Sequence, residues 1–198
     1  MALIKPPAPE EVRAAFRSGL DRSDNATAPP SVRNARFAMA GGAAPDQEQP
    51  VFTLGLQDLA SGNGLAAAQP AGWRIVKRDA AGGAAAGQIT QPAAGGAPVM
   101  LGLAHGSELG EIVAGEIQVE NLPEARSVDY ELRALELPGI PLQAFWLKPV
   151  SAGQDLIVPV RTLSPELQAM RAYPADEFLR IVQPIAAKRL AFDDKPQR

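Results

Sequence analysis

The sequence predicts an α+β protein that is mostly β: an antiparallel sandwich or a partly open barrel with an N-terminal helix and a C-terminal helical segment. Between residues 32 and 160, short apolar or alternating runs are separated by segments rich in glycine, proline and alanine. That spacing is typical of antiparallel sheets. At both ends of the chain, apolar residues recur at helical spacing instead. They follow a proline and two acidic residues, and these residue types favour the start of a helix.

Residues 1–31 are predicted to form an arm, a helix and a linker. Pro6 and Pro7 favour extended backbone in the residues before them. The helix is expected to begin at Pro9, which is followed by two glutamates. It carries an apolar stripe with one residue every four positions: Val12, Phe16 and Leu20.

Residues 32–162 are predicted to form the antiparallel β domain. The clearest strand begins at residue 128, where apolar and charged residues alternate, so that one face is buried and the other is solvated. The glycine-rich segments between the runs are expected to be loops. The predicted strands are residues 32–40, 51–59, 73–78, 86–90, 99–104, 111–120, 128–137, 142–148 and 155–160.

Residues 163–198 are predicted to form a helical segment packed on the β domain. Ser164, Pro165 and Glu166 have the residue types of a helix start. A longer helix is expected to begin at Ala175, with Pro184 deep inside it. Because proline removes a backbone hydrogen bond and clashes with the preceding turn, we expect either a kink at Pro184 or two short helices.

The composition argues against several classes of function. The 198 residues include no cysteine and one histidine, and the net charge is −3. Cysteine and histidine are common nucleophiles, bases and metal ligands, and a nucleic-acid surface needs clustered positive charge. We therefore expect no cofactor, no metal and no nucleic-acid partner. The first residues do not have the pattern of a signal peptide, and no apolar run approaches about 20 residues. We therefore expect no signal peptide, no membrane partner and a cytoplasmic location.

His105 is the centre of the enzymatic alternative. Ser107 lies two residues further on, and Glu111 is nearby. A hydrolase would use His105 as the base, Ser107 as the nucleophile and a carboxylate such as Glu111. The usual G-x-S-x-G elbow is missing, because Ser107 directly follows the first glycine. We expect His105 to be an ordinary residue at a turn or a strand end.

Glu116 and Glu120 alternate with apolar residues and are predicted to lie on one face of a strand. Two carboxylates on one face could serve a glycosidase or a hard cation. The chain has few aromatic residues to hold a sugar and no calcium-loop spacing. We therefore expect a solvated polar face.

Phe145 and Trp146 give the best recognition feature. Adjacent residues on a strand face opposite sides, so one of the two rings is expected in the core while the other points outward. An exposed Trp146 beside Leu147 would be a good anchor for a protein partner. The alternative is that both faces are covered, one of them by a terminal helix.

The resulting hypothesis is a non-catalytic protein-binding or structural subunit of a larger bacterial assembly, in an adaptor or accessory role. The bacterial origin is inferred from the abundance of alanine, glycine and proline and the excess of arginine over lysine. Partner proteins or further copies of the chain are expected to contact the arm 2–9, Phe16, Trp146 and Leu147. Two alternatives are the hydrolase and a small-ligand module at a barrel mouth, with an aromatic ring stacked on the ligand: Tyr130 or Trp73.

Overall fold

The structure is a computed structural model that describes residues 3–22, 29, 32–35, 39, 45–78, 84–91, 96–105, 107–126, 128–162 and 164–193. In these residues the fold is α+β, with one mostly antiparallel nine-stranded open sheet, an N-terminal helix and a C-terminal helix. The predicted class and both terminal helices are therefore confirmed. The described strands show neither a sandwich nor a barrel, because they follow one another in a single sheet with two ends.

The strands are β1 (Leu3–Ile4), β2 (Gln47–Thr53), β3 (Gln69–Arg78), β4 (Ala84–Thr90), β5 (Val99–His105), β6 (Tyr130–Glu136), β7 (Gln143–Pro149), β8 (Leu156–Arg161) and β9 (Tyr173–Pro174). The helices are α1 (Glu10–Arg22), α3 (Leu56–Ala60), α4 (Ser107–Glu120) and α5 (Ala175–Asp193), with short 3₁₀ turns at Gly64–Ala67 and Glu124–Arg126. The strand order is β5-β4-β3-β2-β6-β7-β8-β9, and β1 pairs with β6 in parallel.

Contacts divide the chain into two compact units, each made of separate segments. The α1 unit comprises residues 5–51 and 71–114, and the α5 unit comprises residues 1–4, 52–70 and 115–198. The division of the chain at residues 31 and 162 stays a prediction. Among the described residues, no helix combines the length and the apolar character needed to cross a membrane.

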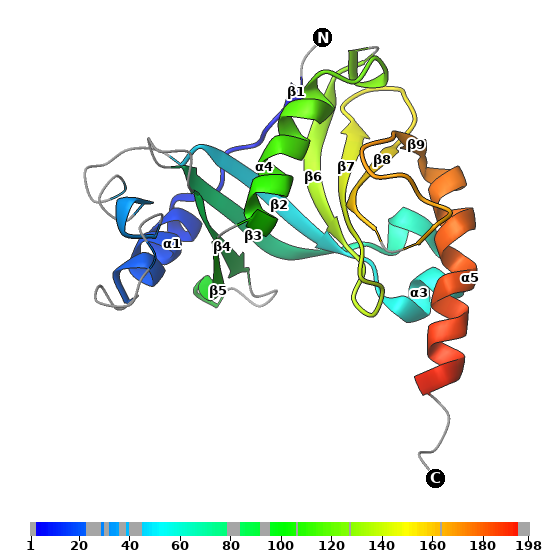
Figure 1. Cartoon of the computed structure of the whole chain (residues 1–198), viewed down its shortest axis with the longest axis horizontal. Coiled ribbons are helices and arrows are strands. Elements are labelled where there is room, and N and C mark those ends of the chain that lie inside the picture. The colour runs from blue at the N-terminus through cyan, green and yellow to red at the C-terminus, as the bar shows by residue number, and fades with distance from the viewer. Residues whose placement is uncertain are drawn as a thin grey trace. The chain divides into compact units, whose positions relative to one another are not determined.

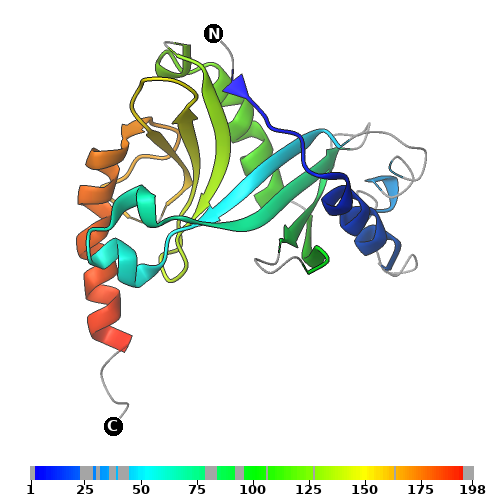
Figure 2. The ribbon, with the colours of Figure 1, turned by 180° about the vertical axis from the view of Figure 1, so that it is seen from behind.

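In the α1 unit, α1 packs against β4 and β5 (Figure 2). Its apolar stripe is buried as the spacing predicts, with Phe16 fully inaccessible. The helix comes so close to the sheet that a Cβ atom at Gly87 would lie 2.6 Å from Cδ2 of Phe16. Glycine at this position therefore sets the distance between α1 and β4.

In the α5 unit, α5 lies beside α3 and β9 (Figure 1). Phe178 of α5 shares a buried core with Trp146 and Tyr173. The helix runs from Ala175 to Asp193 with Pro184 inside it, so the alternative of two short helices is wrong. The other predicted helix start, at Ser164, leads into turns, and Met170 adopts a left-handed φ of 62° that ends any helical path.

Two of the predicted strands are helical instead, and the predicted strand 51–59 ends at Thr53 and leads into α3. Residues 32–35 form part of a helix, and residues 36–38 and 40 of that predicted strand lie outside the described residues. The predicted strand 111–120 belongs to α4. Leu109 and Val113 are one helical turn apart and pack together with Val76 and Ala86. These tertiary contacts favour a helix over the strand that the alternating residues predict.

Candidate functional site

The residues of the predicted hydrolase lie where β5 passes into α4. His105 is the exposed last residue of β5, and its backbone pairs with Ala85. Ser107 begins α4, and Glu111 is exposed on the same helix. The side chain of Ser107 lies outside the described residues, so its pairing with His105 stays a prediction. Among the described residues, no group of three or more metal-ligating side chains is arranged to hold a metal ion.

The residues predicted to anchor a partner are buried in the chain's own cores. Phe16 and Leu147 are inaccessible, and Trp146 is 5% exposed. Trp146 donates a hydrogen bond from Nε1 to Oδ1 of Asp155, and its ring meets Phe52 edge-on at 5.3 Å between centroids. This arrangement matches the alternative in which both faces of the strand are covered. A partner contact at Phe16, Trp146 or Leu147 stays a prediction.

The aromatic residues of the predicted ligand module are also engaged inside the chain. Tyr130 is buried, and Trp73 packs against the core beneath α1. The indole Nε1 of Trp73 donates to Oε1 of Gln91 at 3.3 Å. A ligand stacked on either ring stays a prediction.

The arm is held by the α1 unit from Lys5 onward, whereas Ala2 lies outside the described residues. The backbone amide of Ala8 donates to Oε2 of Glu48 at 2.9 Å. Arg13 donates from Nε and Nη2 to the two oxygens of the same carboxylate, at 2.6 and 2.8 Å. This two-point pairing raises the pKa of Arg13 and ties the arm, α1 and β2 together.

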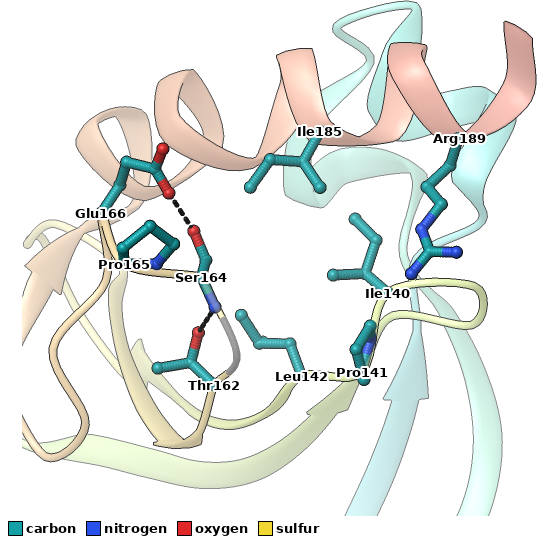
Figure 3. A pocket seen from close by; sticks show the side chains of 9 residues that line it. All are labelled: Ile140, Pro141, Leu142, Thr162, Ser164, Pro165, Glu166, Ile185 and Arg189. Atoms are coloured by element: carbon teal, nitrogen blue, oxygen red, sulfur yellow. Dashed lines mark hydrogen bonds between the residues drawn. The ribbon is translucent and has the colours of Figure 1, made fainter. Parts of the chain in front are cut away.

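A groove in the α5 unit is the first candidate site (Figure 3). Its volume is about 240 Å³, which is below the roughly 300–1,000 Å³ of typical small-molecule pockets. The wall is mainly apolar, with Ile140 and Leu142 on one side and Ile185 of α5 above them. A charged residue stands at each end, Glu166 at one and Arg189 at the other.

The acidic end of the groove is organised by Ser164. Its amide donates to Oγ1 of Thr162 at 3.0 Å, and its hydroxyl donates to the carboxylate of Glu166. The hydroxyl hydrogen bond holds the pKa of Glu166 below its usual value of 4.5, so this carboxylate is negative at neutral pH. The sequence predicts Ser164 and Glu166 only as part of a helix start, because the groove is formed by segments far apart in the chain.

The outer edge of β5 is the second candidate site. β5 is the last strand at one end of the sheet, so no described strand pairs with its outer edge. Met100 and Leu103 pack inward against the α1 core. Val99 and Leu101 point away from it and are 52% and 66% exposed. His105 is the only ionisable residue of the strand.

The opposite end of the sheet is protected in ways that β5 is not. β9 has two residues, one of them Pro174, and leads directly into α5. Short length, proline and an adjoining helix are devices that keep an edge strand from pairing with another chain. The device visible in the described part of β5 is a bulge, which leaves Leu101 without a partner on β4.

Comparisons with known proteins add no family to this picture. No protein-family model matches the chain, and neither a curated protein nor a solved structure matches it. The candidate sites therefore depend on the geometry of this chain alone.

Proposed function

We propose that this chain is a non-catalytic protein-binding subunit that takes an extended segment of a partner onto the outer edge of β5. The observation that carries the proposal is a seven-residue, uncharged and exposed apolar strand at the end of the sheet. Such a strand offers unpaired backbone groups and apolar side chains at once, and soluble proteins ordinarily cover or charge it.

Strand addition explains how β5 would bind. The backbone groups of an incoming strand hydrogen-bond to the edge, and alternate side chains provide specificity. On β5 the exposed side chains of Val99, Leu101 and Ala104 would contact the partner. The segment that fits is a short, extended stretch rich in apolar residues and poor in charge.

The scarcity of reactive residue types supports an adaptor or accessory role for this subunit in a larger bacterial assembly. A chain with one histidine and no cysteine has few routes to nucleophilic or metal-dependent chemistry. We place this assembly in the cytoplasm. The hydrolase built on His105, Ser107 and Glu111 remains the alternative, and a His105→Ala variant that loses a hydrolytic activity without losing stability would favour it.

A photo-crosslinking amino acid placed at Leu101 tests the proposal in the cells from which the chain comes. We expect a crosslinked product of defined mass, with the attachment mapped by mass spectrometry to an extended segment of a protein. Phe192 is the matched control, because it is 71% exposed on α5. Equal background labelling from both positions would contradict the proposal, as would a product that persists when Val99 is replaced by lysine.

The groove between Ile140 and α5 supports a second binding function. Its small volume fits one or two apolar side chains of a protein segment better than a cofactor. The charges of Glu166 and Arg189 at its ends would orient a segment that carries charges of the opposite sign. An Ile185→Trp substitution, which fills the groove, would abolish binding at this site and leave binding at β5 unchanged.

A further inference from the structure

We infer that the groove between Ile140 and α5 binds the C-terminal residue of a partner protein, with the apolar side chain of that residue inside the groove and its carboxylate on Arg189. This inference rests on the second binding function proposed above for the groove, and it names the part of the partner that enters. It does not depend on strand addition at β5.

The charges at the two ends of the groove are not equally compensated by the chain itself. Glu166 accepts a hydrogen bond from the Ser164 hydroxyl, which is the main cause of its lowered pKa, and Lys188 of α5 adds a smaller charge attraction. Arg189, at the other end, has no hydrogen bond or ion pair to the described residues. The charge left for a ligand to balance is therefore positive, and the complementary group is an anion.

An arginine beside an apolar wall favours a carboxylate that is attached to an apolar group. In Figure 3 the guanidinium of Arg189 lies next to the loop of Ile140 and Pro141, while Leu142 and Ile185 line the groove beside them. The planar guanidinium presents paired N–H donors that match the two oxygens of a carboxylate. A ligand that fits both features carries its carboxylate directly beside an apolar side chain.

The volume of the groove limits the size of the ligand. A cavity of about 150 Å³ accommodates one benzene molecule, and on that scale the ~240 Å³ of this groove has room for about ten non-hydrogen atoms. A single leucine or isoleucine residue with its carboxylate is of this size. A helix or a nucleotide is too large.

A chain terminus meets these requirements better than an internal segment. In the last residue of a protein, the carboxylate and the side chain branch from the same α-carbon, so both can enter one small groove. In an internal extended segment, neighbouring side chains point to opposite sides, so an acidic residue beside the apolar one turns away from Arg189. The rest of the partner would leave past Glu166, whose oxygens can accept a backbone N–H. Capture of a C-terminal carboxylate is a recurring mode of peptide recognition.

A short peptide that ends in leucine tests the inference when it is made in two forms, one with a free C-terminal carboxylate and one with a C-terminal amide. Each form is titrated into the full, isotope-labelled chain, and NMR chemical shifts locate the site and give the dissociation constant. We expect the acid to shift the resonances of Ile140, Leu142 and Ile185. It should bind at least ~10-fold more tightly than the amide, because the amide lacks the anion. Equal affinities would overturn the inference.

Substitutions in α5 show whether Arg189 is the group that binds the carboxylate. Arg189→Gln should weaken binding of the acid at least ~10-fold and leave the amide unchanged, so that the two peptides no longer differ. Arg180→Gln is the matched control, because Arg180 is exposed on the same helix and does not line the groove. It should bind both peptides like the wild type. An acid–amide difference that survives Arg189→Gln would overturn the inference, once circular dichroism and thermal unfolding show that both variants are folded.

The outcomes separate this inference from the proposed function of the groove. If both peptides shift the groove resonances with equal affinity, the groove binds apolar side chains and the C-terminal residue is overturned as its occupant. If neither peptide binds at millimolar concentration, both the inference and the groove function fail, while strand addition at β5 is still tested by crosslinking at Leu101.

Octanoate distinguishes a chain terminus from a free apolar acid. It should bind at least ~10-fold more weakly than the peptide acid, because it has no backbone N–H to donate to Glu166. Octanoate that binds as tightly as the peptide acid would assign the groove to a small apolar acid and overturn the inference.

Discussion

The indole Nε1 of Trp146 donates a 2.6 Å hydrogen bond to Oδ1 of Asp155. This bond joins β7 to the start of β8 and satisfies the one polar group of a side chain that is 5% exposed. It explains why the most conspicuous recognition residue of the sequence belongs to the core. Buried indole N–H groups need an acceptor, and here a carboxylate supplies it.

Removal of this acceptor should destabilise the chain. We expect Asp155→Ala to lower the free energy of unfolding by about 1–3 kcal/mol, because the indole N–H is left buried without a partner. Asp155→Asn keeps an oxygen at the same position and should recover part of the loss. Urea unfolding followed by tryptophan fluorescence measures both. Equal losses in the two variants would show that the hydrogen bond is not the cause.

Because Phe16 and Gly87 are in contact, substitutions at the two positions should change the free energy of unfolding non-additively. Gly87→Ala places a methyl group 2.6 Å from the ring, and we expect it to lower the free energy of unfolding by about 1–3 kcal/mol. Phe16→Leu makes room for that methyl group at the cost of a smaller core. The double variant should therefore lose less stability than the sum of the single losses. If the losses in the free energy of unfolding were additive, the contact with Phe16 would not be the cause of the Gly87→Ala effect.

The pH response of Glu166 follows from its hydrogen bond to Ser164. The folded pKa lies below the ordinary value of 4.5, so its contribution to stability is present above pH 4.5 and is lost as the pH falls through the folded pKa. Ser164→Ala should raise the pKa of Glu166 toward the ordinary value, and Ser164→Thr should keep it low. An NMR titration of the side-chain carboxyl carbon measures the shift. An unchanged pKa in Ser164→Ala would exclude the hydroxyl as its cause.

Backbone geometry makes Gly72 intolerant of any side chain. Its φ is +142°, and a Cβ atom would lie 1.9 Å from the carbonyl oxygen of Ile89. We expect Gly72→Ala to lower the free energy of unfolding by at least about 2 kcal/mol, as in other strained positions. Gly110→Ala on the exposed face of α4 should instead raise it by about 0.5–1 kcal/mol. Thermal or urea unfolding of the two variants compares them, and a neutral Gly72→Ala would contradict the geometry.

The sequence pattern predicts an element correctly where its buried residues recur at a single, regular spacing. The stripe through Phe16 and the helix that begins at Ala175 are such cases, and both were correct. Residues 116–120 alternate with a period of two, which favours a strand, yet they belong to α4, in which Leu109 and Val113 make contacts at helical spacing. Short segments that satisfy both periods are decided by tertiary packing.

The candidate sites could not be predicted, because they depend on strand order. Residues 99–104 were correctly predicted to be extended, but nothing local shows that β5 ends the sheet. The sequence alone leaves Trp146 either exposed or covered, because Asp155, the acceptor that decides between the two, lies on the far side of a turn. The groove likewise joins Ile140, Glu166 and Ile185, three segments that the sequence keeps apart.

Amide hydrogen exchange of β5 tests the central claim most directly. The chain would be isolated gently from its own cells, with whatever it binds, and compared with the purified chain at high dilution. We predict that residues 99–105 exchange at least ~10-fold more slowly in the isolated assembly, while β7, which has a strand on each side, exchanges at the same rate in both samples. Equal exchange of residues 99–105 in the two samples would contradict the assignment of this edge as the binding site.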